Sequence, residues 1–184
     1  GDLDIVSAST SDDTIAWYEN DGAANPTWSA ANIATSADGA WGVHVADLDG
    51  DGDLDIVAHY RSGKTIVYLN SDHAFEDGKV VYYDANNPWT QRHYLHDLDH
   101  DGRPELFCAK GPWRDFGTSL QLVKRDGSST LQIRWKSPSD TLFHAFAFAD
   151  VDKDGDEDVI AADYAHGGRV FLYLSENGKL ADAP

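Results

Sequence analysis

Short runs of alternating hydrophobic and polar residues recur along this chain, and turn-forming residues separate them. The first complete set holds Val43 and Val45 in its first run and Ile56 and Val57 in its second. Two sets of four runs can be delimited: 40–47, 54–60, 64–70 and 78–84, then 91–97, 104–110, 118–124 and 131–136. A period of two with β-branched and aromatic residues is typical of β-strands. The pattern predicts an all-β protein.

An acidic segment of nine residues separates the first two runs of each set. Its pattern is Asp-x-Asp-x-Asp-Gly-x-x-(Asp/Glu), and full copies occupy residues 47–55, 97–105 and 150–158. Residues 1–6 repeat the end of the first copy and the strand start after it, residues 52–57. The copies begin at positions 47, 97 and 150, so the repeat is 50 and then 53 residues long. Periods of this length indicate a β-propeller or a solenoid.

The acidic segment also resembles the start of an EF-hand or dockerin loop, and this alternative fails on two counts. A calcium hand needs an acidic ligand at loop position 12 and a helix on each side. Position 12 is Ala58, Cys108 or Ala161 in the three copies. The flanking runs, with Phe146 and Phe148 before the third copy, have the period of strands.

Four short strands per repeat are typical of a propeller blade. We expect each acidic turn to connect an inner strand A to strand B, with strands C and D following. The expected blades are 1–38 without strand A, 39–88, 89–140, and 141–184 without strand D, or about 3.5 blades in one propeller. An open propeller would leave two unpaired edges, which proteins avoid. We therefore expect either a piece of a larger propeller, the preferred interpretation, or closure by self-association.

Carboxylates at alternate positions around a turn glycine fit a hard cation. Ca²⁺ takes six to eight oxygen ligands at about 2.3–2.6 Å. Solvated turns are the alternative, since Asp and Gly both favour turns. Three copies in register between hydrophobic strands favour the cation.

The repeats resemble the FG-GAP/VCBS repeats of integrin α-chain propellers, bacterial surface proteins and some polysaccharide lyases. The resemblance covers nearly the whole chain and implies about three structural Ca²⁺ ions. It implies side-chain ligands Asp47, Asp49, Asp51, Asp55, Asp97, Asp99, Asp101, Glu105, Asp150, Asp152, Asp154 and Asp158, with the backbone carbonyls of Asp53, Arg103 and Asp156. Because His100 and Arg103 adjoin the second site, we expect it to bind most weakly.

Composition narrows the class of partner. The formal net charge is −18, but 15 of the 32 acidic residues lie in the three turns. No basic stripe is present, so we expect no nucleic-acid partner. No apolar run is long enough to span a membrane.

Cys108 is the single cysteine, so no internal disulfide is possible, and we expect it to pack as a small hydrophobe on strand B.

Weak calcium sites load where calcium is abundant, outside the cell. We therefore expect an extracellular or cell-surface protein.

The face opposite the acidic turns is expected to carry aromatic and cationic residues. Candidates for contact with a ligand are Trp41, Tyr60, Arg61, Trp89, Gln91, Arg92, Lys110, Trp113, Arg114, His144, Tyr164 and His166. Aromatic faces stack on sugar rings, and Arg binds carboxylates in a bidentate manner. A carbohydrate, in particular an anionic polysaccharide, is one expected ligand, and a protein is another. Alternatively, these residues pack between blades and cap sheet ends.

Three functions remain open on the sequence. The first is a calcium-stabilised extracellular module that binds carbohydrate or protein. The second is a polysaccharide lyase, or the propeller of another sugar-modifying enzyme. In a lyase, one of Arg61, Arg92 and Arg114 would neutralise a uronate, and one of His144, His166, Tyr60 and Tyr164 would act as base. No spacing selects among them. The third is an adhesion or filament subunit whose blades close between chains.

Other chemistry is not favoured. His93, His96 and His100 suggest a zinc or copper site, but strand residues three apart face opposite sides. The sequence lacks the motifs of serine hydrolases, zincins and nucleotide-binding enzymes.

Overall fold

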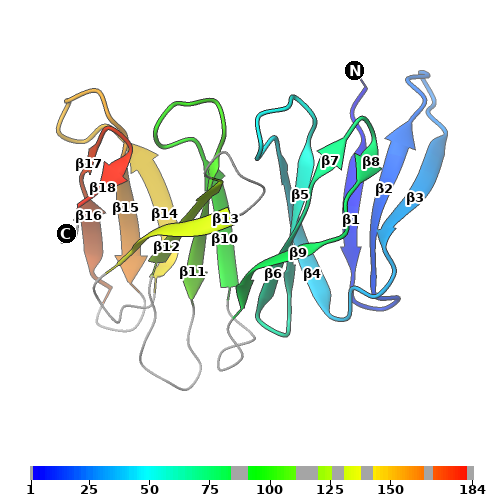
Figure 1. The fold of residues 1–184 in the computed structure, drawn as a ribbon, viewed down its shortest axis with the longest axis horizontal. Coiled ribbons are helices and arrows are strands. Elements are labelled where there is room, and N and C mark those ends of the chain that lie inside the picture. Colours follow the sequence, from blue (N-terminus) through cyan, green and yellow to red (C-terminus); the bar gives the residue numbers. More distant parts are fainter. Residues whose placement is uncertain are drawn as a thin grey trace. The chain divides into compact units, whose positions relative to one another are not determined.

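The computed structural model describes residues 2–83, 91–110, 120–125, 131–137, 143–163 and 168–181. Within these residues the chain forms β-strands and no helix, and the paired strands run antiparallel (Figure 1). The prediction of an all-β protein is confirmed. The chain divides into two compact units, Gly1–Val45 with Asp53–Pro88 and Ala46–Gly52 with Trp89–Pro184.

The first unit contains two sheets whose strands follow one another in chain order. The three-stranded sheet consists of β1 (Ile5–Ser9), β2 (Thr14–Asn20) and β3 (Trp28–Ala34). The four-stranded sheet consists of β4 (Ala40–Ala46), β5 (Asp55–Tyr60), β6 (Lys64–Tyr68) and β9 (Lys79–Tyr83).

The second unit repeats this plan. Its four-stranded sheet consists of β10 (Gln91–His96), β11 (Glu105–Lys110), β12 (Leu120–Arg125) and β13 (Leu131–Lys136). Its three-stranded sheet consists of β14 (Phe143–Ala149), β15 (Asp158–Asp163) and β16 (Val170–Tyr173). The eight strands predicted in the two complete repeats are all present, with ends that differ by at most two residues.

Two short hairpins were not predicted. The first pairs β7 (Asn70–Ser71) with β8 (Ala74–Phe75), and the second pairs β17 (Ser175–Glu176) with β18 (Lys179–Leu180). Each has a two-residue turn with both residues at positive φ: Asp72 (53°) and His73 (65°), then Asn177 (51°) and Gly178 (71°). Such turns match the right-handed twist of a hairpin. Each hairpin follows the third strand of its sheet.

The second strand of a sheet is the one most completely buried. Of the six residues of β5, five are buried, and so are four of the six in β15. In β11, residues 105–108 are all buried. A strand buried on both faces has apolar residues at consecutive positions, as in Ile56-Val57-Ala58. The sheets within a unit therefore pack face to face.

Each unit has its own apolar core between its two sheets. In the first unit, Ile15 from β2 packs with Ile56 and Tyr68 from the four-stranded sheet. In the second unit, Phe107 from β11 packs with Phe143 and Tyr173 from the three-stranded sheet, and β11 contacts β14 directly. Phe107 is 0% and Tyr173 is 0% exposed.

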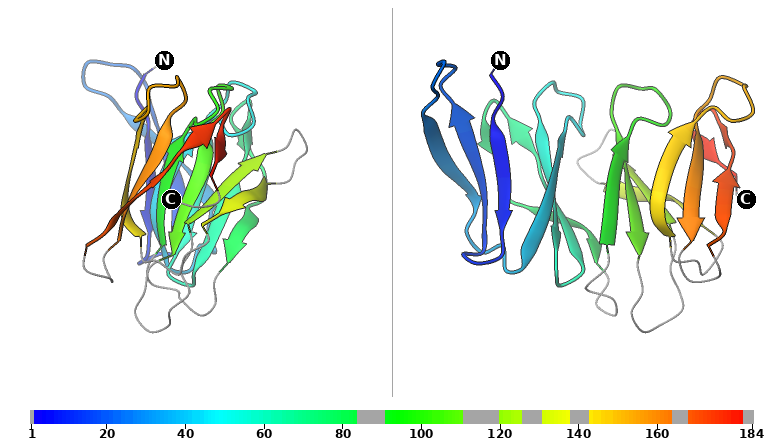
Figure 2. Two further views of the ribbon diagram at one scale, coloured as in Figure 1. Left: turned by 90° about the vertical axis from the view of Figure 1, so that its left-hand side faces the viewer. Right: turned by 180° about the vertical axis from the view of Figure 1, so that it is seen from behind.

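The acidic turns connect the first strand to the second in three sheets. In the second unit, the β10–β11 and β14–β15 turns lie at the same end, together with the β17–β18 hairpin (Figures 1 and 2). In the first unit, the N-terminus lies at the end where β5 begins, beside the β7–β8 hairpin (Figure 1). The repeated motif is therefore at an equivalent place in each sheet.

Candidate metal centres

Three groups of carboxylates converge in the acidic turns. They are Asp47 with Asp49 and Asp55, Asp97 with Asp99 and Asp101, and Asp150 with Asp152 and Asp158. Within each group, one carboxylate oxygen of every residue lies within 4.8 Å of the others. Ligand oxygens on opposite sides of one Ca²⁺ are about 5 Å apart, given metal–oxygen distances of about 2.3–2.6 Å. The carboxylates present therefore fit one hard cation per turn.

The first Asp of each turn fixes the path of the backbone. The two oxygens of Asp97 accept hydrogen bonds from the backbone N–H groups of Asp101 (3.1 Å) and Gly102 (2.8 Å). The corresponding bond in the third turn runs from Gly155 N to Asp150 Oδ2 at 3.2 Å. Asp side chains form such bonds readily, which explains their place at the start of turns.

Positions four and six of each turn adopt the left-handed backbone conformation. Position six is Gly in every copy, and Gly155 has a φ of 101°. Position four is Gly50, His100 or Lys153, with φ values of 80°, 55° and 66°. Residues other than Gly are disfavoured in this conformation. The sequence did not show that position four shares this requirement.

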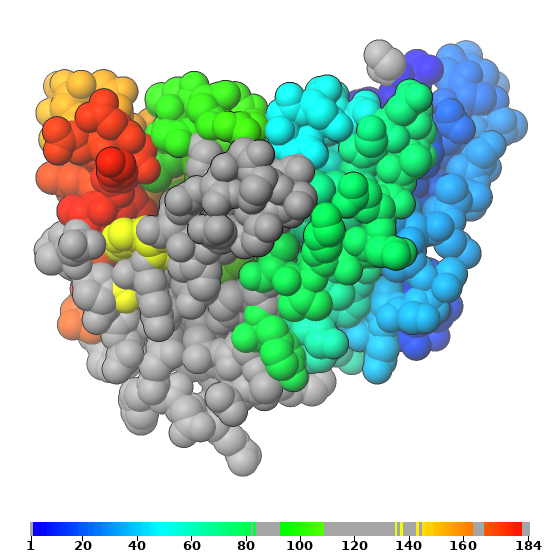
Figure 3. All heavy atoms as spheres, in the orientation of Figure 1, coloured from blue at the N-terminus to red at the C-terminus, as the bar shows by residue number. Residues whose placement is uncertain are grey.

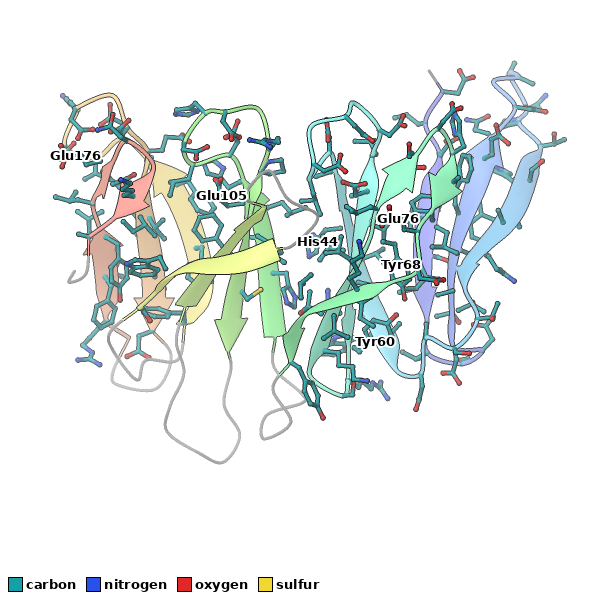
Figure 4. The ribbon with its side chains drawn as sticks, in the orientation of Figure 1. His44, Tyr60, Tyr68, Glu76, Glu105 and Glu176 are labelled. Atoms are coloured by element: carbon teal, nitrogen blue, oxygen red, sulfur yellow. The ribbon has the colours of Figure 1, made fainter. Side chains whose placement is uncertain are left out.

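The ninth position carries the most buried carboxylates of the turns. Asp55, Glu105 and Asp158 are 0%, 1% and 0% exposed, and Glu105 lies below its turn (Figure 4). Asp158 accepts hydrogen bonds from Val151 N and Ser175 N, both at 2.9 Å. One carboxylate thus joins the turn to the chain that follows the third strand.

This link recurs in other sheets. Asp55 Oδ1 accepts a hydrogen bond from Asn70 N at 2.8 Å. Asp4, in the partial copy, accepts one from Asn20 N at 2.9 Å. In the second turn the bond of the longer Glu105 is instead within the turn, from Leu98 N at 2.7 Å. The ninth residue is therefore a structural acceptor as well as a candidate ligand.

The seventh position was predicted to contribute only a backbone carbonyl, a role that stays a prediction. Its side chain has a contact of its own. Asp53 Oδ2 accepts a hydrogen bond from Asp72 N, and Asp156 Oδ2 accepts one from Asn177 N, both at 2.6 Å. These bonds anchor the two unpredicted hairpins. In the third turn, the hairpin and the acidic segment lie side by side at the surface (Figure 3).

Each hairpin also contacts the sheet that precedes its own. In the first unit, His73 at the tip of the β7–β8 hairpin stacks on Trp17 of β2, with ring centroids 5.5 Å apart. In the second unit, a Cβ placed on Gly178 would lie 2.1 Å from Cβ of Asp99, so only Gly fits this approach. The hairpins thus connect successive sheets.

Residues 1–58 and 97–161 match the profile of the FG-GAP-like repeat. The two segments together make up more than half of the chain and contain all three acidic turns. The chain belongs to the FG-GAP-like repeat family. The resemblance inferred from the sequence is thereby confirmed, and membership supports a β-propeller-like module. No curated protein matches the chain.

The second FG-GAP-like turn differs from the others in its charge. Arg103 Nη2 donates to Asp101 Oδ2 at 2.8 Å, and Arg103 N donates to Asp101 Oδ1 at 3.0 Å. These contacts raise the pKa of the Arg103 guanidinium. In the third turn, desolvation and the negative charges of Asp154 and Asp158 raise the pKa of Asp152. Negative charges therefore act on Asp152 in the third turn, whereas in the second a guanidinium pairs with Asp101.

Only part of the candidate ligand-contacting face lies within the described residues. Trp41 is 44% exposed and meets the His59 ring edge-on, and Arg61 is exposed. Tyr60 is 4% exposed, and its hydroxyl lies 2.7 Å from that of Tyr68 (Figure 4), so the structure does not place Tyr60 at the surface. Residues outside the described ranges are Trp89, Trp113, Arg114, Tyr164 and His166. The side chains of Gln91, Arg92, Lys110 and His144 are also outside the description.

Cys108 and the histidines of the suggested zinc or copper site were the other candidates from the sequence. Cys108 is 2% exposed on β11, where burial raises the pKa of its thiol, as expected for a packed cysteine. His93 is 5% exposed, and His96 pairs with Glu157. In the described part of the chain, no group of three metal-type ligands includes a histidine. Across the same residues, no helix has the length and apolar character to cross a membrane.

Proposed function

We propose that this chain is a calcium-stabilised β-propeller module that binds a carbohydrate outside the cell. The observation that carries the calcium part is the convergence of three carboxylates in each turn, from positions one, three and nine in the first and third turns and from positions one, three and five in the second. All the donors are oxygens, which suit hard cations such as Ca²⁺ rather than zinc or copper. Asp51, Asp154 and Glu105 are further side-chain ligands in this proposal, and the carbonyls of Asp53, Arg103 and Asp156 complete the sites.

Calcium would offset the repulsion among the clustered carboxylates. The ninth-position Asp already joins the acidic turn to the chain beyond the third strand, as Asp158 does through Ser175 N. An ion held by Asp150, Asp152 and Asp158 would therefore fix the relative position of three strands. Its role is structural.

The propeller part of the proposal rests on the sheets. Their strand orders are β1-β2-β3, β4-β5-β6-β9, β10-β11-β12-β13 and β14-β15-β16. Assigned to blades, these correspond to BCD, ABCD, ABCD and ABC, the sequence predicted for about 3.5 blades. Within each unit the sheets pack through apolar faces, as blades do.

The binding part of the proposal rests on Trp41 and Arg61. Arg61 donates its backbone N–H to Gly39 O at 2.8 Å, two residues before Trp41, at the end of the sheet away from the acidic turn. Both side chains are exposed. An exposed indole and a guanidinium suit an acidic sugar, which offers an apolar ring face and a carboxylate. A protein ligand is the other outcome of the test below. Among the residues of the lyase alternative, only Tyr60 and Arg61 have described side chains, and Tyr60 is buried.

Thermal unfolding in Ca²⁺ and in EGTA tests the calcium site. A ligand at 100 times its Kd stabilises the folded state by about 2.7 kcal/mol per site. Asp150→Asn with Asp152→Asn should abolish much of this gain, whereas Asp77→Asn, at an exposed position outside the turns, should retain it. Equal melting temperatures of the wild type in Ca²⁺ and EGTA would refute the structural role of calcium.

Calorimetric titration with polygalacturonate tests the ligand. Trp41→Ala and Arg61→Ala should each weaken binding about tenfold or more, whereas Trp28→Ala, which removes another exposed indole (42%), should not. Neutral dextran should bind weakly. If the acidic saccharide fails to bind while calcium still stabilises the fold, the carbohydrate assignment is wrong and a protein ligand is favoured.

A further inference from the structure

Arg103 is the single cation at the seventh position of the acidic turns, where the other copies have Asp53 and Asp156. Its guanidinium forms an ion pair with Asp101, Nη2 to Oδ2, at 2.8 Å. The two side chains are 32% and 30% exposed, so solvent screens the pair only in part. Asp101 belongs to the group of converging carboxylates in the second turn. Arg103 therefore already pairs with a carboxylate that would help to hold a metal ion there.

The side chain of Arg103 also reaches the preceding turn. A Cβ placed on Gly50 would lie 2.8 Å from Cδ of Arg103 and 3.7 Å from its Nε. Among the charges that raise the pKa of Arg103 are those of Asp99 and Asp47, after the larger effects of Asp101. Arginine remains protonated at every physiological pH. A permanent positive charge thus lies among carboxylates of two turns.

The first and third turns use the seventh residue differently. Asp53 and Asp156 direct their carboxylates to backbone N–H groups of the β7–β8 and β17–β18 hairpins. These two residues add negative charge to their turns, where Arg103 adds positive charge to the second. The third turn does contain Lys153, but at the fourth position. In the second turn, by contrast, the guanidinium at the seventh position is hydrogen-bonded to one of the converging carboxylates.

We propose that Arg103 is a built-in counter-ion that holds the second turn together without calcium and weakens calcium binding there. The inference rests on the proposed calcium binding of the first and third turns. An incoming Ca²⁺ at the second turn would face a fixed like charge and would compete for Asp101. Because the number of ligand charges tunes the affinity of such sites, the second turn binds Ca²⁺ at least about tenfold more weakly than the other two.

Hydrogen–deuterium exchange of the wild-type chain tests this without any substitution. EGTA should speed exchange in peptides that cover residues 47–55 and 150–158. It should leave exchange over residues 97–105 unchanged within about twofold. Equal acceleration in all three turns would overturn the counter-ion role of Arg103. It would leave the proposed calcium binding intact.

Native mass spectrometry at set free Ca²⁺ concentrations gives a second test. The wild type should bind two ions at low Ca²⁺ and a third only at about tenfold higher concentration. Arg103→Gln and Arg103→Asp should bring the third binding step down to the range of the first two, whereas Lys153→Gln, with the same charge change in the third turn, should not. Three equivalent ions in the wild type would refute the inference alone, and no ion at any concentration would refute calcium binding itself.

Discussion

The imidazole Nε2 of His96 lies 2.6 Å from the carboxylate Oε2 of Glu157. His96 ends β10, directly before the second acidic turn, and Glu157 lies inside the third. The His96 ring also stacks on Phe148 of β14, with centroids 3.9 Å apart and planes inclined by 8°. The pair therefore joins two successive sheets at the level of their acidic turns.

Substitution of Glu157 by Gln is expected to lower the free energy of unfolding by at most about 1 kcal/mol, because both side chains are partly exposed. His96→Ala should cost more, about 1–2 kcal/mol, since the stacked contact with Phe148 is lost as well. Urea unfolding measures both, with Glu176→Gln at an exposed hairpin position as control. A larger loss for Glu157→Gln than for His96→Ala would contradict this ranking.

Asp158 is expected to be structurally required even without metal. Asp158→Ala removes the acceptor of Val151 N and Ser175 N at a site that is 0% exposed, so about 2–4 kcal/mol should be lost in EGTA. Asp152→Ala, at an exposed position, should change stability by less than about 1 kcal/mol in EGTA. Chemical unfolding with and without Ca²⁺ compares them. Equal losses for the two variants in EGTA would show that the ninth residue has no role beyond metal binding.

Because of His59, we expect the folded protein to lose stability in mild acid. Burial, together with the nearby charge of His44, lowers the pKa of His59 to about 4, against 6.5 for an ordinary histidine. The unfolded chain therefore takes up a proton near pH 6.5 that the folded protein accepts only near pH 4. The free energy of unfolding should fall as the pH is lowered through this interval, by up to about 3 kcal/mol in total.

NMR titration of the imidazole carbons checks the pKa of His59 directly. Unfolding curves at pH 7 and pH 5 should show a smaller pH effect in His59→Gln than in the wild type. An imidazole that titrates near pH 6.5 in the folded protein would exclude this source of acid sensitivity.

Substitution of Gly42 is expected to lower stability because of the same histidine. A Cβ at this position would lie 2.1 Å from Nε2 of His59. Gly42→Ala should therefore cost about 1–3 kcal/mol, and His59→Ala in the same chain should recover part of that loss. Gly52→Ala is a useful comparison, since its Cβ would meet nothing within 4 Å and only its φ of 97° opposes the change. Additive effects of Gly42→Ala and His59→Ala in thermal unfolding would show that the two do not compete for space.

The repeated pattern was sufficient to predict the strands and the acidic turns. Each strand is defined by local alternation, and each turn by nine consecutive residues. Deviations are small: the run 64–70 ends as a strand at Tyr68, because Asn70 begins β7 instead. The turn Asn177-Gly178 was a hairpin signal in the sequence, but strands of two residues are too short to show a period.

The contacts between sheets could not be predicted in the same way. The bond between Asp53 and Asp72, and the contact of Arg103 with Gly50, join residues from separate runs. Their geometry depends on how the sheets pack. Asp53 and Asp156 belong to the repeated acidic pattern. The sequence therefore did not show that their carboxylates bind the backbone of the hairpins rather than a metal ion.

The chain-order arrangement of strands has a consequence for the way the protein acquires its fold. Every described sheet pairs its main strands as they occur along the chain, with only the β7–β8 hairpin interposed between β6 and β9. Contacts that are close in sequence close small loops, and proteins rich in them fold quickly. During synthesis each sheet can form as soon as its own residues have emerged, before the next sheet exists. Within each unit, the hairpin can then dock the second sheet onto the completed first, so that assembly of a unit can follow the direction of translation.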